Sequence, residues 1–161
     1  MPKTYGEAKT FINQEAHIYY YLGILLEGQG RENEAKEAYE NASIYKAAIS
    51  EISLFRALAL NKLGKFDEAN QVLKEMIDAA ENMITNCDMR SYYGVGSPSP
   101  MPFELNIERH NLTDGNILKA FALLGFGEIK EANETIESAE KIEPNDFRIY
   151  AFKEILPTIS K

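Results

Sequence analysis

A six-residue pattern, Gly-x-x-x-Glu-Ala, occurs three times and constrains the fold more than any other feature of the chain. The copies begin at Gly30, Gly64 and Gly127. The first two are 34 residues apart, and the last two are 63 apart, which is one such period plus 29 residues. A fixed period of this length is the signature of stacked copies of one supersecondary unit. We therefore expect three such units, with a long insertion between the second and the third.

Each copy of the pattern lies between two stretches with helical periodicity. Tyr19, Leu22 and Leu26 follow the spacing of one helix face, and an acidic run begins after each glycine. A glycine there can end the first helix in a left-handed conformation at little cost. Small residues recur where the two helices of a unit would approach closely: Gly23, Ala35, Ala57, Ala69, Ala120 and Ala132.

The first unit resembles a tetratricopeptide repeat (TPR) at nearly every motif position: Tyr19, Leu22, Gly23, Leu26, Gly30, Ala35, Tyr39 and Ala42. The second unit keeps Ala57, Leu60, Gly64, Ala69 and Leu73, but has Arg56 and Met76 where Leu and a small residue are usual. The third keeps Ala120, Leu123, Gly127, Ala132, Ile136, Ala139 and Pro144, but departs at Asn116 and Lys119. The resemblance implies an all-α solenoid of three helix-turn-helix units.

The pattern also predicts where the helices lie. We expect a single domain over residues 1–161, with helix pairs at about 14–29 and 32–47, 50–63 and 66–86, and 112–126 and 129–141. The corresponding units are about 16–47, 50–86 and 113–144. Asn145-Asp146 should cap a last helix over about 146–155, which covers the open end of the stack.

The insertion is predicted over about 88–111, where Gly, Pro and aromatic residues replace the helical pattern. Such long loops are usually either functional or disordered. Tyr92, Tyr93, Met101 and Phe103 indicate that this one packs against something, either its own repeats or a partner. Residues 103–109 have helical spacing and could extend the following helix backward, and Thr113-Asp114-Gly115 are expected to interrupt it.

Composition excludes several classes of function. With 45% hydrophobic and 26% charged residues the chain is typical of globular proteins, and no run approaches the roughly 20 apolar residues that span a bilayer. A net charge of −8 has the wrong sign for a nucleic-acid-binding surface. Residues 1–7 lack the apolar segment of an export signal, so a cytoplasmic location is expected.

A search for catalytic or metal-binding chemistry yields no candidate. Cys87 is the one cysteine, and His17 and His110 are far apart, without the ligand spacing of a metal site. The Gly-x-Gly sequences at 94–96 and 125–127 lack the remainder of a phosphate-binding motif. We therefore expect no catalytic residue, metal or cofactor.

The resemblance to TPR proteins implies a concave groove lined by the first helix of each unit. The corresponding positions are His17, Tyr20, Ile24 and Glu27 in the first unit, Glu51, Leu54, Leu58 and Asn61 in the second, and Asp114, Ile117, Phe121 and Leu124 in the third. The centre of this set is apolar, which suits a partner helix, an aromatic peptide or a second copy of the chain. The insertion or the last helix could instead fill the groove.

These observations favour a non-catalytic module for protein–protein interaction or scaffolding. An alternative comes from the Ser- and Pro-rich segment before Phe103 and the Leu-Leu-Gly-Phe-Gly sequence at 123–127. Together they resemble the TPR tails of large bacterial proteins with an uncharacterised, carbohydrate-related domain. The chain would then be an accessory C-terminal domain that packs on a catalytic domain of the same polypeptide. A third hypothesis is a homodimer formed through the groove or through an uncovered first helix.

Overall fold

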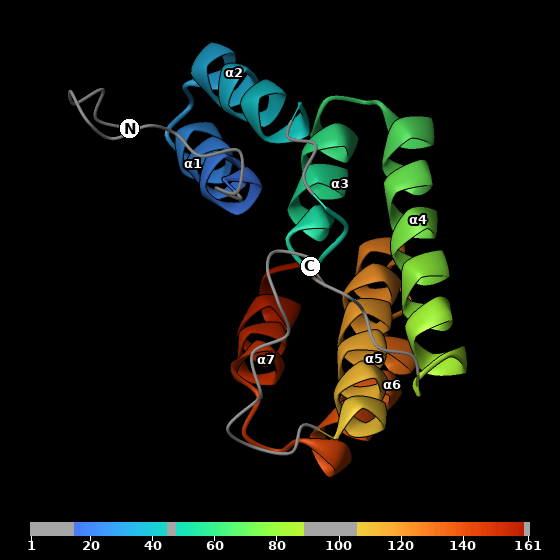
Figure 1. Ribbon diagram of the computed structural model, residues 1–161. Coiled ribbons are helices and arrows are strands. Elements are labelled where there is room, and N and C mark those ends of the chain that lie inside the picture. The colour runs from blue at the N-terminus through green and yellow to red at the C-terminus, as the bar shows by residue number, and fades with distance from the viewer. Residues whose placement is uncertain (1–14, 45–47, 89–105, 160–161) are drawn as a thin grey trace, which may run out of the picture. The chain divides into compact units, whose positions relative to one another are not determined.

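The computed structural model describes residues 15–44, 48–88 and 106–159, and within these ranges the chain forms seven α-helices and no strand (Figure 1). The chain divides into two compact units, residues 1–72 and 73–161. We describe each unit by itself. The predicted all-α fold is confirmed, and the prediction of a single domain stays a prediction.

The first unit contains three complete helices, α1 (Ala16–Gly28), α2 (Glu32–Ser43) and α3 (Ser53–Lys62). Each of the three packs against the other two. A cluster of aromatic rings fills the space between α1 and α3, where Tyr20 and Tyr21 both contact Phe55 at centroid distances of 5.8 and 5.4 Å. The core of this unit therefore joins α1 and α2 to the helix that follows them.

The second unit contains α5 (Ile107–Phe126), α6 (Ile129–Ile142) and α7 (Phe147–Ile159). The helix α4 (Phe66–Thr85) begins in the first unit and ends in the second. Helices α5 and α6 form a hairpin, and α7 packs against both. The predicted cap of the last helix is confirmed at Asp146, whose carboxylate accepts a hydrogen bond of 2.9 Å from the Arg148 amide.

The three glycines of the repeated pattern end their helices in the same way. Gly30, Gly64 and Gly127 have φ of +74°, +74° and +80° and are the described residues with positive φ. In each turn the amide after the glycine donates to the carbonyl of a leucine five residues earlier, at 2.9 to 3.0 Å, namely Leu26, Leu60 or Leu123. Each glycine amide also donates to the carbonyl three residues before it. These are the two hydrogen bonds of a Schellman motif.

Small residues bring the helices close together, as predicted from their spacing. Ala35, Ala69 and Ala132 are each at most 3% exposed. The closest approach is at Gly23 on α1, where a Cβ atom would lie 2.4 Å from the ring atom Cε1 of Tyr39 on α2. The aromatic ring thus occupies the volume that any side chain at position 23 would need.

The start of α5 corrects the predicted insertion. This helix begins at Ile107, five residues before the predicted start at 112, because the Asn106 side chain caps it by accepting a hydrogen bond from the Arg109 amide. Residues 107–111 are therefore helical and do not belong to the insertion. Residues 89–105, which include Tyr92, Tyr93, Met101 and Phe103, lie outside the described residues.

The predicted interruption at Thr113-Asp114-Gly115 is wrong, since α5 runs through it. Thr113 donates its hydroxyl to the Arg109 carbonyl, so its polar group is satisfied within the helix. Gly115 allows α5 to lie close to α4, since a Cβ there would be 2.7 Å from Ile84 Cγ1 and 2.9 Å from the Ala80 carbonyl oxygen. The glycine is required by a neighbouring helix and does not break its own.

Other boundaries also differ from the predictions, and α2 ends at Ser43, before the predicted end at 47. Helix α3 begins at Ser53, so that Glu51 lies in the turn before it. Helix α7 continues to Ile159, beyond the predicted end at 155.

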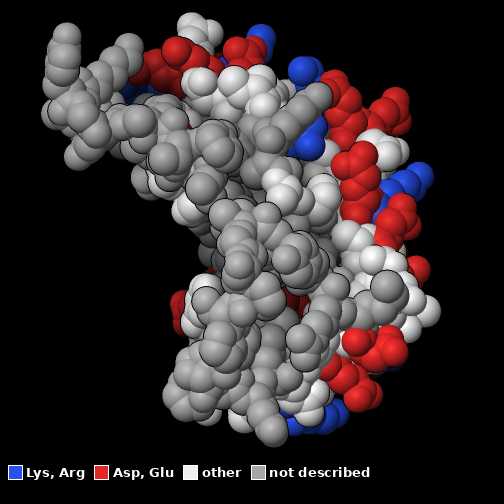
Figure 2. Space-filling model, viewed as in Figure 1, with Lys and Arg blue, Asp and Glu red and all other residues white. Residues whose placement is uncertain are grey.

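The described helices do not include a membrane span, because none of them combines sufficient length with sufficient apolar character. Acidic side chains outnumber basic ones on α4. The helix contains five acidic residues and one basic residue, Lys74; the acidic residues are Asp67, Glu68, Glu75, Asp78 and Glu81. Figure 2 shows these charges as red and blue groups along the side of the molecule where α4 lies in Figure 1. This solvated surface has the negative sign expected from the net charge.

We predict that Gly23→Ala lowers the free energy of unfolding by about 1–3 kcal/mol, because the added methyl group clashes with the Tyr39 ring. Gly28→Ala is the matched control on the same helix. A Cβ at position 28 meets nothing within 4 Å, so this change should be neutral or stabilising by up to about 1 kcal/mol. Urea unfolding followed by circular dichroism measures both values, and equal effects of the two substitutions would contradict the close approach of α1 to α2.

Candidate binding surface

The groove positions predicted for the first two repeats lie in the compact unit of residues 1–72, some in its core and some nearer its surface. Tyr20 and Leu54 are buried, and Ile24, Leu58 and Asn61 are half-buried. Side chains in the first group make their contacts inside the protein, so they offer a partner little accessible area.

His17 and Glu51 lie at the beginning of their segments. The His17 ring is half-buried and 5.9 Å from the Phe55 ring, and its Nδ1 atom is buried without a hydrogen-bond partner in the described structure. Glu51 is half-buried, and its carbonyl accepts from the Leu54 amide in the turn that starts α3.

Glu27, another predicted groove residue, joins three helices. Its carboxylate accepts a hydrogen bond of 2.6 Å from the Tyr39 hydroxyl on α2 and bonds of 2.8 and 3.1 Å from the Lys62 ammonium on α3. These bonds hold the pKa of Glu27 below its ordinary value, and the bond from Lys62 has the largest effect. Burial and the Glu27 carboxylate raise the pKa of Tyr39. Glu27 therefore already has two intramolecular partners.

In the compact unit of residues 73–161, the apolar groove residues predicted for the third repeat are buried. Ile117, Phe121 and Leu124 are at most 1% exposed. The Phe121 ring meets the Phe152 ring of α7 edge to face, with centroids 5.4 Å apart. These three side chains therefore lie in the core, where they offer no accessible area to a partner.

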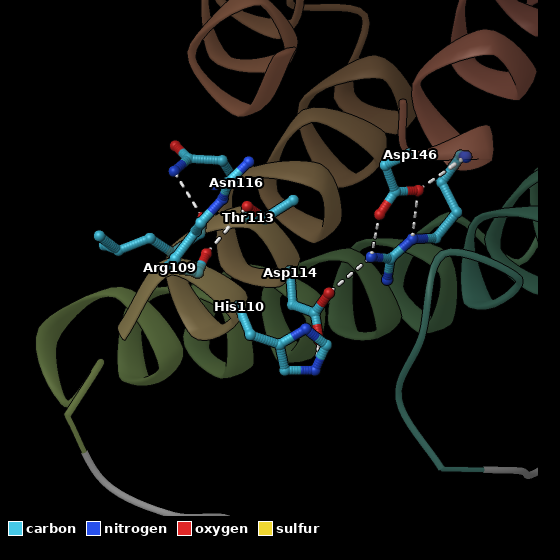
Figure 3. Close-up of polar contacts among 8 residues, drawn as sticks. Arg109, His110, Thr113, Asp114, Asn116 and Asp146 are labelled. Carbon is cyan, nitrogen blue, oxygen red and sulfur yellow. Dashed lines mark hydrogen bonds and ion pairs between the residues drawn. The ribbon is translucent and has the colours of Figure 1, made fainter. Parts of the chain in front are cut away.

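Asp114 takes part in an ionic cluster that fixes α7 to α5 (Figure 3). The Arg148 guanidinium lies between Asp114 and Asp146, at 2.6 Å from an oxygen of each. His110 approaches the other oxygen of Asp114 at 3.2 Å. The hydrogen bond from Arg148 is the main cause that lowers the pKa of Asp146. One guanidinium thus bridges two carboxylates in a half-buried position, so it holds α7 to α5.

Among the described residues, exposed apolar side chains follow one another along a face of α1. Ile18, Leu22 and Leu25 are 45%, 43% and 64% exposed, and Tyr21 beside them is 37% exposed while its ring also contacts Phe55 of α3. The four residues are spaced i, i+3, i+4 and i+7, so they form one stripe along the helix. No Asp, Glu, Lys or Arg occurs from Ala16 to Leu26. We call Ile18, Tyr21, Leu22 and Leu25 the α1 stripe.

The residues at the same spacing on α3 are covered. Positions 34 residues after the α1 stripe are Ile52, Phe55, Arg56 and Ala59, and Phe55 and Ala59 are buried. The Arg56 guanidinium donates a hydrogen bond of 3.1 Å to the carbonyl of Ser43 at the end of α2. The preceding helix thus packs on this face of α3.

In the compact unit of residues 73–161, the equivalent faces of α5 and α7 are also covered by the preceding helix. On α5, Gly115 lies against Ala80, Met83 and Ile84 of α4, and Lys119 pairs with Glu81 of that helix at 3.3 Å. On α7, a further 34 residues along, Ile149 and Phe152 are fully buried, and Lys153 pairs with Glu140 of α6 at 2.7 Å. In α3, α5 and α7, the position equivalent to Leu22 is therefore a basic residue that bonds to the preceding helix.

The described residues contain no group of three His, Cys, Asp or Glu side chains that could hold a metal ion. Comparison of the chain with protein-family models, with curated proteins and with solved structures found no match.

The hypothesis of a homodimer through an uncovered first helix named this helix but not the residues of the α1 stripe. Leu22 was matched to a TPR motif position, and Ile18, Tyr21 and Leu25 were not singled out. The signal that could have found them is visible in the sequence, because an uncharged run of 11 residues from Ala16 to Leu26 contains four apolar residues at helical spacing.

We predict that Arg148→Met lowers the free energy of unfolding at pH 7 by about 1–3 kcal/mol, because it leaves two carboxylates near each other without their cation. Lys130→Met is the control, since Lys130 pairs with Glu134 on an exposed helix surface and should matter little.

The pH dependence gives a second measure of the same cluster. The pKa of Asp146 is lower in the folded chain than its ordinary value of 3.8, so the ionised carboxylate stabilises the fold above pH 3.8. This stabilisation is lost as the pH falls from 3.8 through the lowered pKa of Asp146. Urea titrations from neutral to acidic pH should therefore show a smaller loss of stability for Arg148→Met than for the natural chain. Parallel pH curves would contradict this role of Arg148.

Proposed function

We propose that the chain is a non-catalytic protein-interaction module built from TPR-like helix pairs. The 34-residue spacing, the three matching glycine turns and the burial of equivalent small residues support this assignment. In such repeat architectures each unit buries its apolar face against a neighbour, so an apolar face that no described helix covers is available to a partner.

The α1 stripe is the observation that carries the proposal. On α3, α5 and α7 the equivalent face is covered by the preceding helix, whereas on α1 its side chains are exposed. The proposed ligand is a helix of a protein partner that lies along α1 with an apolar face. The binding surface thus differs from the groove expected from sequence, whose apolar members are largely in the core.

The accessory-domain hypothesis remains a second candidate, supported by the same face. In a longer polypeptide, a helix N-terminal to α1 could lie on the α1 stripe as α2 lies on α3. An association with a carbohydrate-active domain rests on the sequence resemblance alone.

Site-specific photo-crosslinking in cells tests the proposal. A photoreactive benzoylphenylalanine at position 25 should form a covalent adduct with a protein, because Leu25 is the most exposed residue of the stripe. The same group at Phe147 on α7, which is 74% exposed, is the control for random collision. Absence of an adduct at position 25, or equal adducts at both positions, would contradict the proposal.

A further inference from the structure

The chemistry of the α1 stripe restricts what can cover it. A covering helix of the kind seen on α5 and α7 presents an acidic side chain, Glu81 or Glu140, to the basic residue at the Leu22-equivalent position. On α1 that position is Leu22, which would leave such a carboxylate desolvated and without a partner. The occupant is therefore expected to place an apolar residue, and not a carboxylate, against Leu22.

Among the described helices of the chain, α1 itself has the longest uncharged stretch, from Ala16 to Leu26. Its neighbouring charge at Glu27 is already neutralised by Lys62, which reduces repulsion between two copies of a chain with net charge −8. We propose, on the basis of the proposed function, that the protein partner of the α1 stripe is the α1 stripe of a second copy.

The spacing of the stripe suits a two-fold symmetric contact. If two copies of α1 lie antiparallel, Ile18 of one meets Leu25 of the other, and the axis passes near Tyr21 and Leu22. Such an isologous contact is closed, so it forms dimers and no larger assembly. Because a single 13-residue helix supplies the contact, the area is below that of a standard interface. We therefore expect a weak dimer that dissociates on dilution.

Sedimentation of the purified full chain over a wide concentration range tests the dimer. The natural chain should shift from monomer to dimer with increasing concentration, and Leu25→Glu should raise the dissociation constant at least tenfold. Phe147→Glu, at an aromatic residue outside the stripe that is 74% exposed, should leave the dissociation constant unchanged. Circular dichroism of each variant checks that it is folded.

A charge exchange at the axis tests the symmetry. Leu22→Lys and Leu22→Glu should each be monomeric alone, and an equimolar mixture of the two should form a heterodimer, because residue 22 then faces its counterpart across the axis. A chain that is monomeric at all concentrations would overturn the proposal, as would a dimer that persists in Leu25→Glu. If position 25 forms adducts only with another protein, the dimer is wrong and the interaction module stands; if it forms no adduct, both fail.

Discussion

The left-handed glycine turn is the constraint on which the rest of this structure depends. A helix ends with carbonyl groups that lack intrahelical partners, and the Schellman hydrogen bonds satisfy two of them while reversing the chain. The bonds form only if the residue at the turn adopts positive φ, which costs glycine little and costs other residues more. The same turn places the next alanine, at positions 35, 69 and 132, in a buried site. One local conformation thus sets the direction and the depth of each second helix.

Much of the fold could be predicted from the sequence because its signals are local. Gly30, Gly64 and Gly127 mark helix ends in the printed sequence, and the structure gives all three the expected left-handed conformation. Gly115 shows the limit of this reasoning, since its sequence context resembles a break while its function is to admit α4. No property of residues 113–115 alone reveals which helix passes beside them.

The candidate site was harder to predict because exposure is a property of the whole packing. Phe121 was expected to line a groove, but α7 supplies Phe152 to cover it. Glu27 was expected to meet a partner, but Tyr39 and Lys62 already use its carboxylate. Conversely, Leu25 is 64% exposed, whereas Ala59, the residue 34 positions later, is buried. Packing against a neighbouring helix therefore decides whether a residue at the same spacing lies in the core or on the surface.

Hydrogen exchange measured by nuclear magnetic resonance at the amides of Arg31, Lys65 and Glu128 tests the account most directly. Each of these amides follows a turn glycine and donates to a leucine carbonyl five residues earlier. The account predicts that all three exchange slowly in the folded chain, although each lies in a connection between helices. Exchange at the rate of an unstructured peptide at any of the three would contradict the shared turn on which the arrangement of the helices rests.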